Sequence, residues 1–265
     1  MPATDVPVTL MNWLAVLEFD VALLIIIIPV MVVSALGALV TRSIFGRAIS
    51  PASTVGQSKV GAAAEIYAVV LGFIIVFGFS EFQDTKRDVL HEATLLDRLI
   101  AEASIEPSAE TPIKSAVVTY VTDVVERDWP LMSFGASSIE AEASARALDA
   151  EVRHLAGLVS PLQSYRMLSL VDNLAARRTE RLSSSPDPVV AAIVFQVLAV
   201  GIVLAIVTGW FVRGPSVVVH MVLSAMISGA VVTLMILSAQ LLYPFAGSVA
   251  ISSEPFVAVL ETARL

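Results

Sequence analysis

The chain has 265 residues, of which 57% are hydrophobic and 15% are charged, whereas soluble domains are roughly 45–50% apolar and about 25% charged. The net charge of −8 and the lack of any basic run interleaved with aromatic residues argue against nucleic-acid binding. The absence of cysteine excludes disulfide bonds and thiolate chemistry. Because the apolar residues gather in four runs of bilayer length, the sequence predicts an integral membrane protein.

Those four runs are the predicted membrane spans. The first, Val21 to Val40, is not a cleavable signal peptide, because its apolar core is too long, no basic residue precedes it and no small-x-small cleavage pattern follows. The second, Val60 to Ser80, contains a single ionisable residue, Glu65. The third covers Pro188 to Val212 and the fourth covers Ser216 to Tyr243. Each is long enough to cross a bilayer as one helix.

Residues 81–187 differ in composition, with 18 acidic and 11 basic side chains. Apolar residues recur there at helical spacing in four segments, without the alternation typical of strands. We expect four amphipathic helices that form a bundle. Their expected boundaries are an end at Pro107, a cap at Thr111 before Pro112, a stop at Trp129-Pro130, a capping box from Ser137 to Glu140, and a start after Pro161.

The predicted fold is all-α: a polytopic membrane protein with four transmembrane helices and an inserted amphipathic helical bundle. Residues 1–80 hold an N-terminal tail and the first two spans, and residues 81–187 form the extramembrane domain. Residues 188–243 hold the last two spans, and residues 244–265 form a C-terminal tail. No helix breaker separates the second span from the charged segment after it, so one helix is expected to join the membrane part to the domain.

The second span carries two different faces. One stripe at helical spacing is small and polar in its first half and suits a water-filled path or close helix contact. It consists of Glu65, Ala68, Gly72, Val76 and Phe79, preceded by Gly61. The opposite face, with Ile66, Val70, Phe73 and Phe77, suits lipid or packed protein.

Glu65 has two interpretations. It lies about 9 Å along the helix from Lys59, below the membrane interface. It is either a carboxylate that lines an ion path, or a carboxylate near the positive helix end that is solvated or hydrogen-bonded to a neighbour.

The last two spans carry residues that favour helix packing. Gly201, Ala205 and Gly209 repeat every four residues and allow two helices to approach closely. Gln196 and Gln240 are expected to form hydrogen bonds between helices.

The motifs of metal and catalytic sites are incomplete. His91-Glu92 begins like a zinc-protease signature, but residue 95 is leucine where the second ligand would stand. Glu151-x-x-His154 is half of a di-iron motif without its second pair. We therefore expect no metal, no cofactor and no catalytic residues.

Three arginines before the third span, Arg177, Arg178 and Arg181, could meet lipid headgroups or pair with acids of the domain such as Glu92. Pairing within the bundle is favoured. Trp129 is expected to cap the core of the bundle.

Loop charges predict the orientation in the membrane. Arg42, Arg47 and Lys59 lie in one short loop without acids, and Arg213 lies in the turn between the last two spans. Basic short loops stay in the cytoplasm, so the helical domain and both termini are expected outside, in the periplasm.

Several short motifs resemble the bestrophin-like domain family of bacterial membrane proteins, from about residue 55 to 258. They are Tyr67 to Phe73 with Phe82-Gln83 and Glu92-Ala93, Glu126-x-x-Trp129-Pro130, Arg178-x-x-Arg181-Leu182, and Pro244-Phe245-x-Gly247. The resemblance implies likeness to bestrophins, which are oligomeric anion channels with a second helix lining the pore and a cytoplasmic helical domain. It further implies a bacterial inner membrane protein.

Two functions remain open at this point. The first is an oligomeric ion channel or pore lined by the second span, with the bilayer, further copies of the chain and inorganic ions as partners. The second is a non-conducting scaffold or sensor whose helical domain binds a partner.

Overall fold

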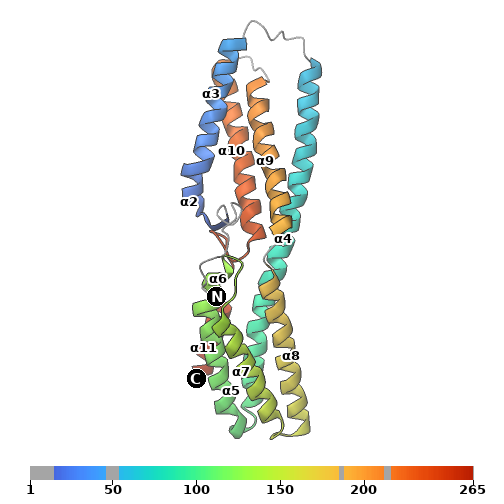
Figure 1. Cartoon of the computed structure of the whole chain (residues 1–265), viewed down its shortest axis with the longest axis vertical. Coiled ribbons are helices and arrows are strands. Elements are labelled where there is room, and N and C mark those ends of the chain that lie inside the picture. The colour runs from blue at the N-terminus through green and yellow to red at the C-terminus, as the bar shows by residue number, and fades with distance from the viewer. Residues whose placement is uncertain (1–14, 46–53, 185–187, 212–215, 265) are drawn as a thin grey trace. The chain divides into compact units, whose positions relative to one another are not determined.

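The computed structural model describes residues 15–45, 54–184, 188–211 and 216–264. All regular elements in this described part are helical and none is a strand, which confirms the all-α prediction (Figure 1). The elements are α2 (Phe19–Ala22), the π-helical turn η1 (Leu23–Ile27), α3 (Ile28–Phe45), α4 (Thr54–Ala103), α5 (Pro107–Asp123), the π-helical turn η2 (Val124–Asp128), α6 (Trp129–Met132), α7 (Ile139–Ala156), α8 (Pro161–Ser183), α9 (Pro188–Phe211), α10 (Val217–Leu242) and α11 (Glu254–Arg264).

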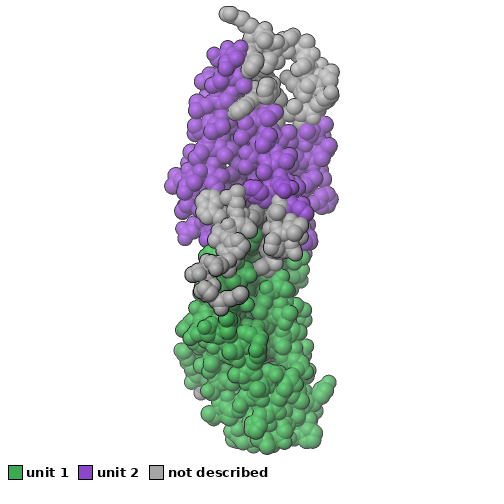
Figure 2. All heavy atoms as spheres, in the orientation of Figure 1, with its two compact units in different colours: residues 1–8, 81–186, 243–265 green, residues 9–80, 187–242 purple. Residues whose placement is uncertain are grey.

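The described residues divide into two compact units, coloured separately in Figure 2. The membrane unit contains residues 9–80 and 187–242, and the domain unit contains residues 81–186 and 243–265. Helix α4 is continuous and contributes residues to both. The sequence predicts only a C-terminal tail after the fourth span. In the structure, residues 243–265 belong to the domain unit.

Three helices in the described residues are long and apolar enough to cross a membrane: Phe19–Thr41, Gly61–Ala103 and Val217–Leu242. The third predicted span corresponds to α9, whose shorter apolar stretch in the described part covers Ile193–Val207. The count of four spans therefore stays a prediction. The π-helical turn η1 ends two residues before Pro29, which has no N–H to donate to the preceding turn and whose ring needs the extra room.

Small residues hold α3 and α10 together inside the membrane unit. The hydroxyl of Ser228 donates to that of Ser34 at 2.8 Å, and Ser34 donates to the Ser224 carbonyl at 3.2 Å. At Gly229 an added Cβ would lie 2.8 Å from the sulfur of Met31, so a larger residue there would require the Met31 side chain to shift. Helices α3, α9 and α10 lie side by side (Figure 1).

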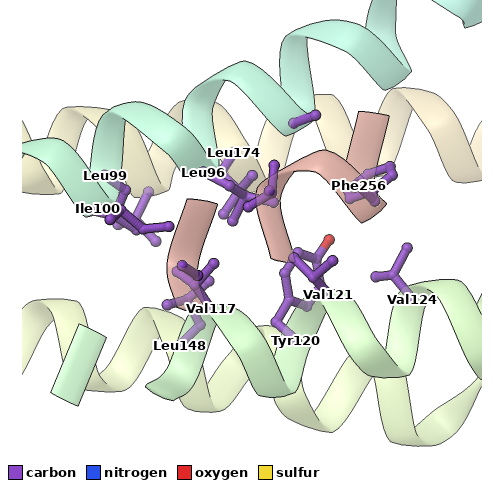
Figure 3. Packing of buried hydrophobic residues seen from close by; sticks show 14 of the residues in the cluster. Leu96, Leu99, Ile100, Val117, Tyr120, Val121, Val124, Leu148, Leu174 and Phe256 are labelled. Carbon is purple, nitrogen blue, oxygen red and sulfur yellow. The ribbon is translucent and has the colours of Figure 1, made fainter. Parts of the chain in front are cut away.

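The core of the domain unit forms from the predicted amphipathic stripes. The stripe of α4 (Val89, Ala93, Leu96, Ile100 and Ala103) and that of α5 and η2 (Ile113, Val117, Tyr120, Val121 and Val124) are both fully buried, as predicted. Figure 3 shows members of both stripes, among them Leu96 and Val117, in one cluster with Leu148 of α7, Leu174 of α8 and Phe256 of α11. Phe256 comes from the tail and is completely inaccessible to solvent.

The structure corrects three predicted helix boundaries. Helix α5 begins at Pro107, because this proline occupies the first turn, so Thr111 is not a cap and Pro112 lies inside the helix. The cap of α7 is Ser138 rather than Ser137, because the backbone is extended at Ser138 and its hydroxyl accepts from the amides of Glu140 and Ala141.

Trp129-Pro130 does not stop the helix, which continues through η2 into α6. The π-helical turn shifts the hydrogen-bond register just before Pro130, and this proline then lies in the first turn of α6.

Candidate functional site

Within the membrane unit, α4 faces its own chain through a narrow sector. Leu71 is buried. Tyr67 lies against Gly201 of α9, so that a Cβ added at Gly201 would overlap the tyrosine ring and hydroxyl. A Cβ added at Gly78 would lie 3.2 Å from Cβ of Leu241. These three α4 positions follow one another at helical spacing and define the inner face.

The predicted stripe lies on another face and is exposed along its whole length in the single chain. Glu65, Ala68 and Gly72 are exposed, and Val76 and Phe79 are 68% and 53% exposed. A Cβ added at Gly61 or at Gly72 would meet nothing within 4 Å. Among the described residues, none packs against this stripe at Gly61 or Gly72.

The bulky face of α4 is exposed as well. Ile66 and Phe73 are 68% and 69% exposed, and Phe77 is exposed too. Helix α4 thus presents two different surfaces outward, one with small residues and a carboxylate and the other apolar and aromatic. Apolar side chains lose nothing against lipid tails, whereas a carboxylate against lipid is costly. The two faces therefore suit different surroundings.

The residues expected to pack the last two spans have different environments. Gly201 and Ala205 are buried, whereas Gln196 is exposed in the single chain. The Gln240 amide donates to the carbonyl of Leu17 at 3.1 Å. Gly209 lies in α9, outside the residues whose side-chain surroundings the structure describes.

A cluster of charged residues is buried in the domain unit. Arg181 of α8 and Glu92 of α4 are both completely inaccessible to solvent. Arg181 donates through Nε to one Glu92 oxygen at 2.7 Å and through Nη2 to the other at 3.2 Å, a bidentate pair. The Tyr120 hydroxyl also donates to Glu92. The predicted pairing of these arginines with Glu92 is thus confirmed at Arg181.

Asp128 links this pair to a second one. Its carboxylate lies 3.5 Å from Nη1 of Arg181 and 3.7 Å from Nη2 of Arg178, and it accepts from the Ser138 amide at 2.7 Å. Arg178 in turn donates to Glu142 at 2.6 Å. The cluster thereby connects α4, η2, α7 and α8.

The tail covers the same cluster from another side. The Arg181 guanidinium lies 5.7 Å from the ring centroid of Trp129 and 5.6 Å from that of Phe256, within cation–π range. The Trp129 indole contacts Phe245 and Phe256 edge to face, and its N–H donates to the Ile251 carbonyl at 3.2 Å. Trp129 packs on the core as predicted, and it also fixes the tail.

Burial determines the protonation of this cluster. Burial raises the pKa of the Tyr120 phenol well above its usual value, and the Glu92 charge raises it further. Burial alone would lower the pKa of Arg181, but Glu92 more than reverses this and leaves the pKa above its usual range. Tyr120 therefore stays a neutral hydrogen-bond donor and Arg181 stays charged. Such a cluster holds helices in register and offers no free base or nucleophile.

The half-motifs for metals stay separate. Among the residues that the structure describes, no group of three or more His, Cys, Asp or Glu side chains could hold a metal ion. Glu92, from the first half-motif, instead forms an ion pair with Arg181.

These features define a class: a helical membrane protein with apolar helices, a charged helical domain unit and a tail built into that unit. The model of the Bestrophin-like domain matches residues 28–256, so the chain belongs to the bestrophin-like family, as its motifs predicted.

Solved structures show the same fold. A bacterial bestrophin homologue from Klebsiella pneumoniae matches with a TM-score of 0.69 at 17% identity, over 89% of this chain and 95% of that chain. Two single-site variants of a homologue from this organism give 0.67 at 19% identity and 0.65 at 20%, over 89% and 91% of this chain and 93% and 95% of theirs. No curated protein matches the chain.

Sequence reasoning missed the part that the tail and Asp128 play. Asp128 lies inside the Glu126-x-x-Trp129-Pro130 motif, next to an aromatic residue that was expected to cap the core, and this was a usable signal. The apolar spacing of Phe256, Val259 and Ala263 was another, because it marks an amphipathic helix in the tail.

Proposed function

We propose that this membrane protein forms an oligomeric ion channel or pore lined by residues 61–80 of α4. The exposed stripe of α4 is the observation that carries the proposal. Glu65 is exposed in the single chain, and the next positions of its stripe, Ala68 and Gly72, are small. An acid that faces lipid is costly, by about 2.5–3.5 kcal/mol at the centre of a span, and Glu65 lies nearer to the end of its span than to the centre. A water-filled path shared by several copies removes that cost.

The family supports this proposal. Bestrophins, which the motifs resemble, are oligomeric channels with a second helix lining the pore. Helix α4 is the second long apolar helix here, and α9 would be the third of four spans. A ring of α4 helices would bring one Glu65 from each copy to one depth, and rings of carboxylates attract cations. The preferred ion would then be a cation, unlike the anion that the resemblance implies.

The proposed location is the bacterial inner membrane. The loop charges favour a periplasmic domain unit, whereas the resemblance to bestrophins favours a cytoplasmic one. As a channel the protein would not be an enzyme. The charged residues of the domain unit form ion pairs with one another, namely Arg181 with Glu92 and Arg178 with Glu142.

A non-conducting scaffold or sensor is the second candidate. It is favoured by large apolar side chains that stay exposed on the domain unit, namely Ile105, Leu158 and Tyr165 at 62%, 67% and 72%. Such residues suit a protein partner.

Ion flux from purified protein in liposomes separates the two functions. The subunit count is measured first, by native mass spectrometry or by electron microscopy of the same sample. A channel gives a ring and a flux that a bulky residue at Gly72 blocks, whereas Ile66→Leu on the apolar face leaves the flux unchanged. Correctly assembled protein that passes no ions at any pH would sink the channel and leave the scaffold.

A further inference from the structure

The domain unit has an apolar groove between α4 and the tail. Its volume is about 360 Å³, within the range of small-ligand clefts. Helix α4 provides one wall with Phe82, Lys86, Val89 and Leu90, and the tail provides the other with residues 249–252, Glu254 and Pro255. Val89 and Ile251 are buried in its floor, whereas Leu90 and Val249 are 44% and 40% exposed at its edge.

The tail wall is held in place by hydrogen bonds of the Ile251 backbone. The Ile251 amide donates to the Pro244 carbonyl at 2.8 Å, and its carbonyl accepts from Trp129. Gly247 has a φ of 77°, which favours glycine and lets the chain turn back on itself. The groove is therefore formed before anything binds to it.

The charges on this groove have one sign on each wall. Lys86 on α4 and Glu254 on the tail are both exposed, and neither has an ion-pair partner in the described part of the chain. Of the charges beside them on α4, Arg87 pairs with Asp84 and Asp88 pairs with Arg177, whereas Glu81 is exposed and lies outside the groove lining. The groove itself thus carries one cation and one anion beside an apolar floor.

Both walls directly follow apolar helices in the sequence. Phe82 comes two residues after the apolar run that ends at Ser80, about 3 Å along the same helix. Val249 comes seven residues after the end of α10 at Leu242. A lipid headgroup at the surface of the bilayer is therefore a fitting occupant.

We propose that this groove binds a zwitterionic aminophospholipid of the phosphatidylethanolamine type. Lys86 donates to the phosphate, Glu254 accepts from the primary ammonium group, and Phe82, Val89 and Ile251 contact the glycerol and the first methylenes. An anionic lipid without an amine would satisfy Lys86 but face Glu254 unpaired. Phosphatidylcholine carries no N–H to donate to Glu254. The proposal does not depend on ion conduction.

The test measures lipid retention by full-length purified protein with native mass spectrometry. The lipids are phosphatidylethanolamine, phosphatidylcholine and phosphatidylglycerol with identical acyl chains. Wild type should retain phosphatidylethanolamine most strongly. Lys86→Gln and Glu254→Gln should each weaken it about tenfold, since each removes one charge-assisted hydrogen bond. Glu254→Gln should also raise retention of phosphatidylglycerol.

Arg87→Gln is the matched control, because Arg87 neighbours Lys86 but lies outside the groove and pairs with Asp84. Val249→Trp fills the groove from its exposed edge and should abolish retention without changing a charge. Equal retention of the three lipids, a preference for phosphatidylglycerol, or equal effects of Lys86→Gln and Arg87→Gln would each overturn the proposal.

Discussion

Arg181 is a charged residue that is completely buried, and its neighbours stabilise the charge. Glu92 balances the charge with two hydrogen bonds, Asp128 lies 3.5 Å away, and two aromatic rings flank the guanidinium. Removing one member of such a group leaves another charge buried without a partner. The arrangement therefore makes the register of α4 against α8 specific.

Arg181→Met should lower the free energy of unfolding of the domain unit by about 3–5 kcal/mol, because Glu92 stays buried and unpaired. The double variant Arg181→Met/Glu92→Leu should lose less than this single variant. Urea unfolding of full-length protein in detergent, followed by tryptophan fluorescence, measures both. Losses that simply add would show that the two residues are not coupled.

The contact between Tyr67 and Gly201 gives a second prediction at this scale. Gly201→Ala should lower the free energy of unfolding of the membrane unit by about 1–3 kcal/mol, because the added methyl group overlaps the ring of Tyr67. Gly72→Ala is the control, since that position has open space, and it should be neutral or slightly stabilising. Adding Tyr67→Ala to Gly201→Ala should relieve the overlap, and a failure to do so would place the damage elsewhere.

At the scale of elements, α11 is part of the domain core although it lies far from it in sequence. Phe256→Ala should cost about 3–5 kcal/mol, because the ring is completely buried and also contacts Trp129 and Arg181. Val257→Ala, at a neighbouring residue that is 40% exposed, should cost much less. Equal shifts in the melting temperature would mean that α11 is not docked in solution.

The helices could be predicted because each buries a stripe that recurs at helical spacing, as the fully buried stripes of α4 and α5 show. Their boundaries were less predictable where proline has two possible roles. Pro107 could end one helix or begin the next. The cap of α7 is Ser138 rather than Ser137 because the backbone is extended at Ser138, where its amide donates to Asp128.

The charged cluster could be predicted only in part. The three arginines before the third span were expected to pair with acids of the domain, and Glu92 was named as one such acid. Asp128 and Phe256 were missed because their contacts with Arg181 join residues 53 and 75 positions apart, and no local pattern encodes such pairs. The pore-lining role of the stripe that contains Glu65 stays a prediction, because the residues that would face it belong to other copies of the chain.

For the whole molecule, orientation can be measured without knowing the function. The chain contains no cysteine, so single cysteines report without interference. The loop charges predict that Ser137→Cys reacts with a membrane-impermeant thiol reagent in intact spheroplasts and that Ser53→Cys does not. The reverse pattern would place the domain unit in the cytoplasm, as in bestrophins. Labelling after permeabilisation is the control for accessibility.

The last prediction concerns a ring of α4 helices, in which every copy contributes Glu65 at the same depth. We expect a conductance that favours cations, because the ring of carboxylates attracts them. Glu65→Gln keeps the size of the side chain and should remove the cation preference, while the assembly stays intact. Reversal potentials across a salt gradient, recorded in planar bilayers, measure this preference. A preference for cations that survives Glu65→Gln would show that other groups select the ion and that Glu65 lies off the path.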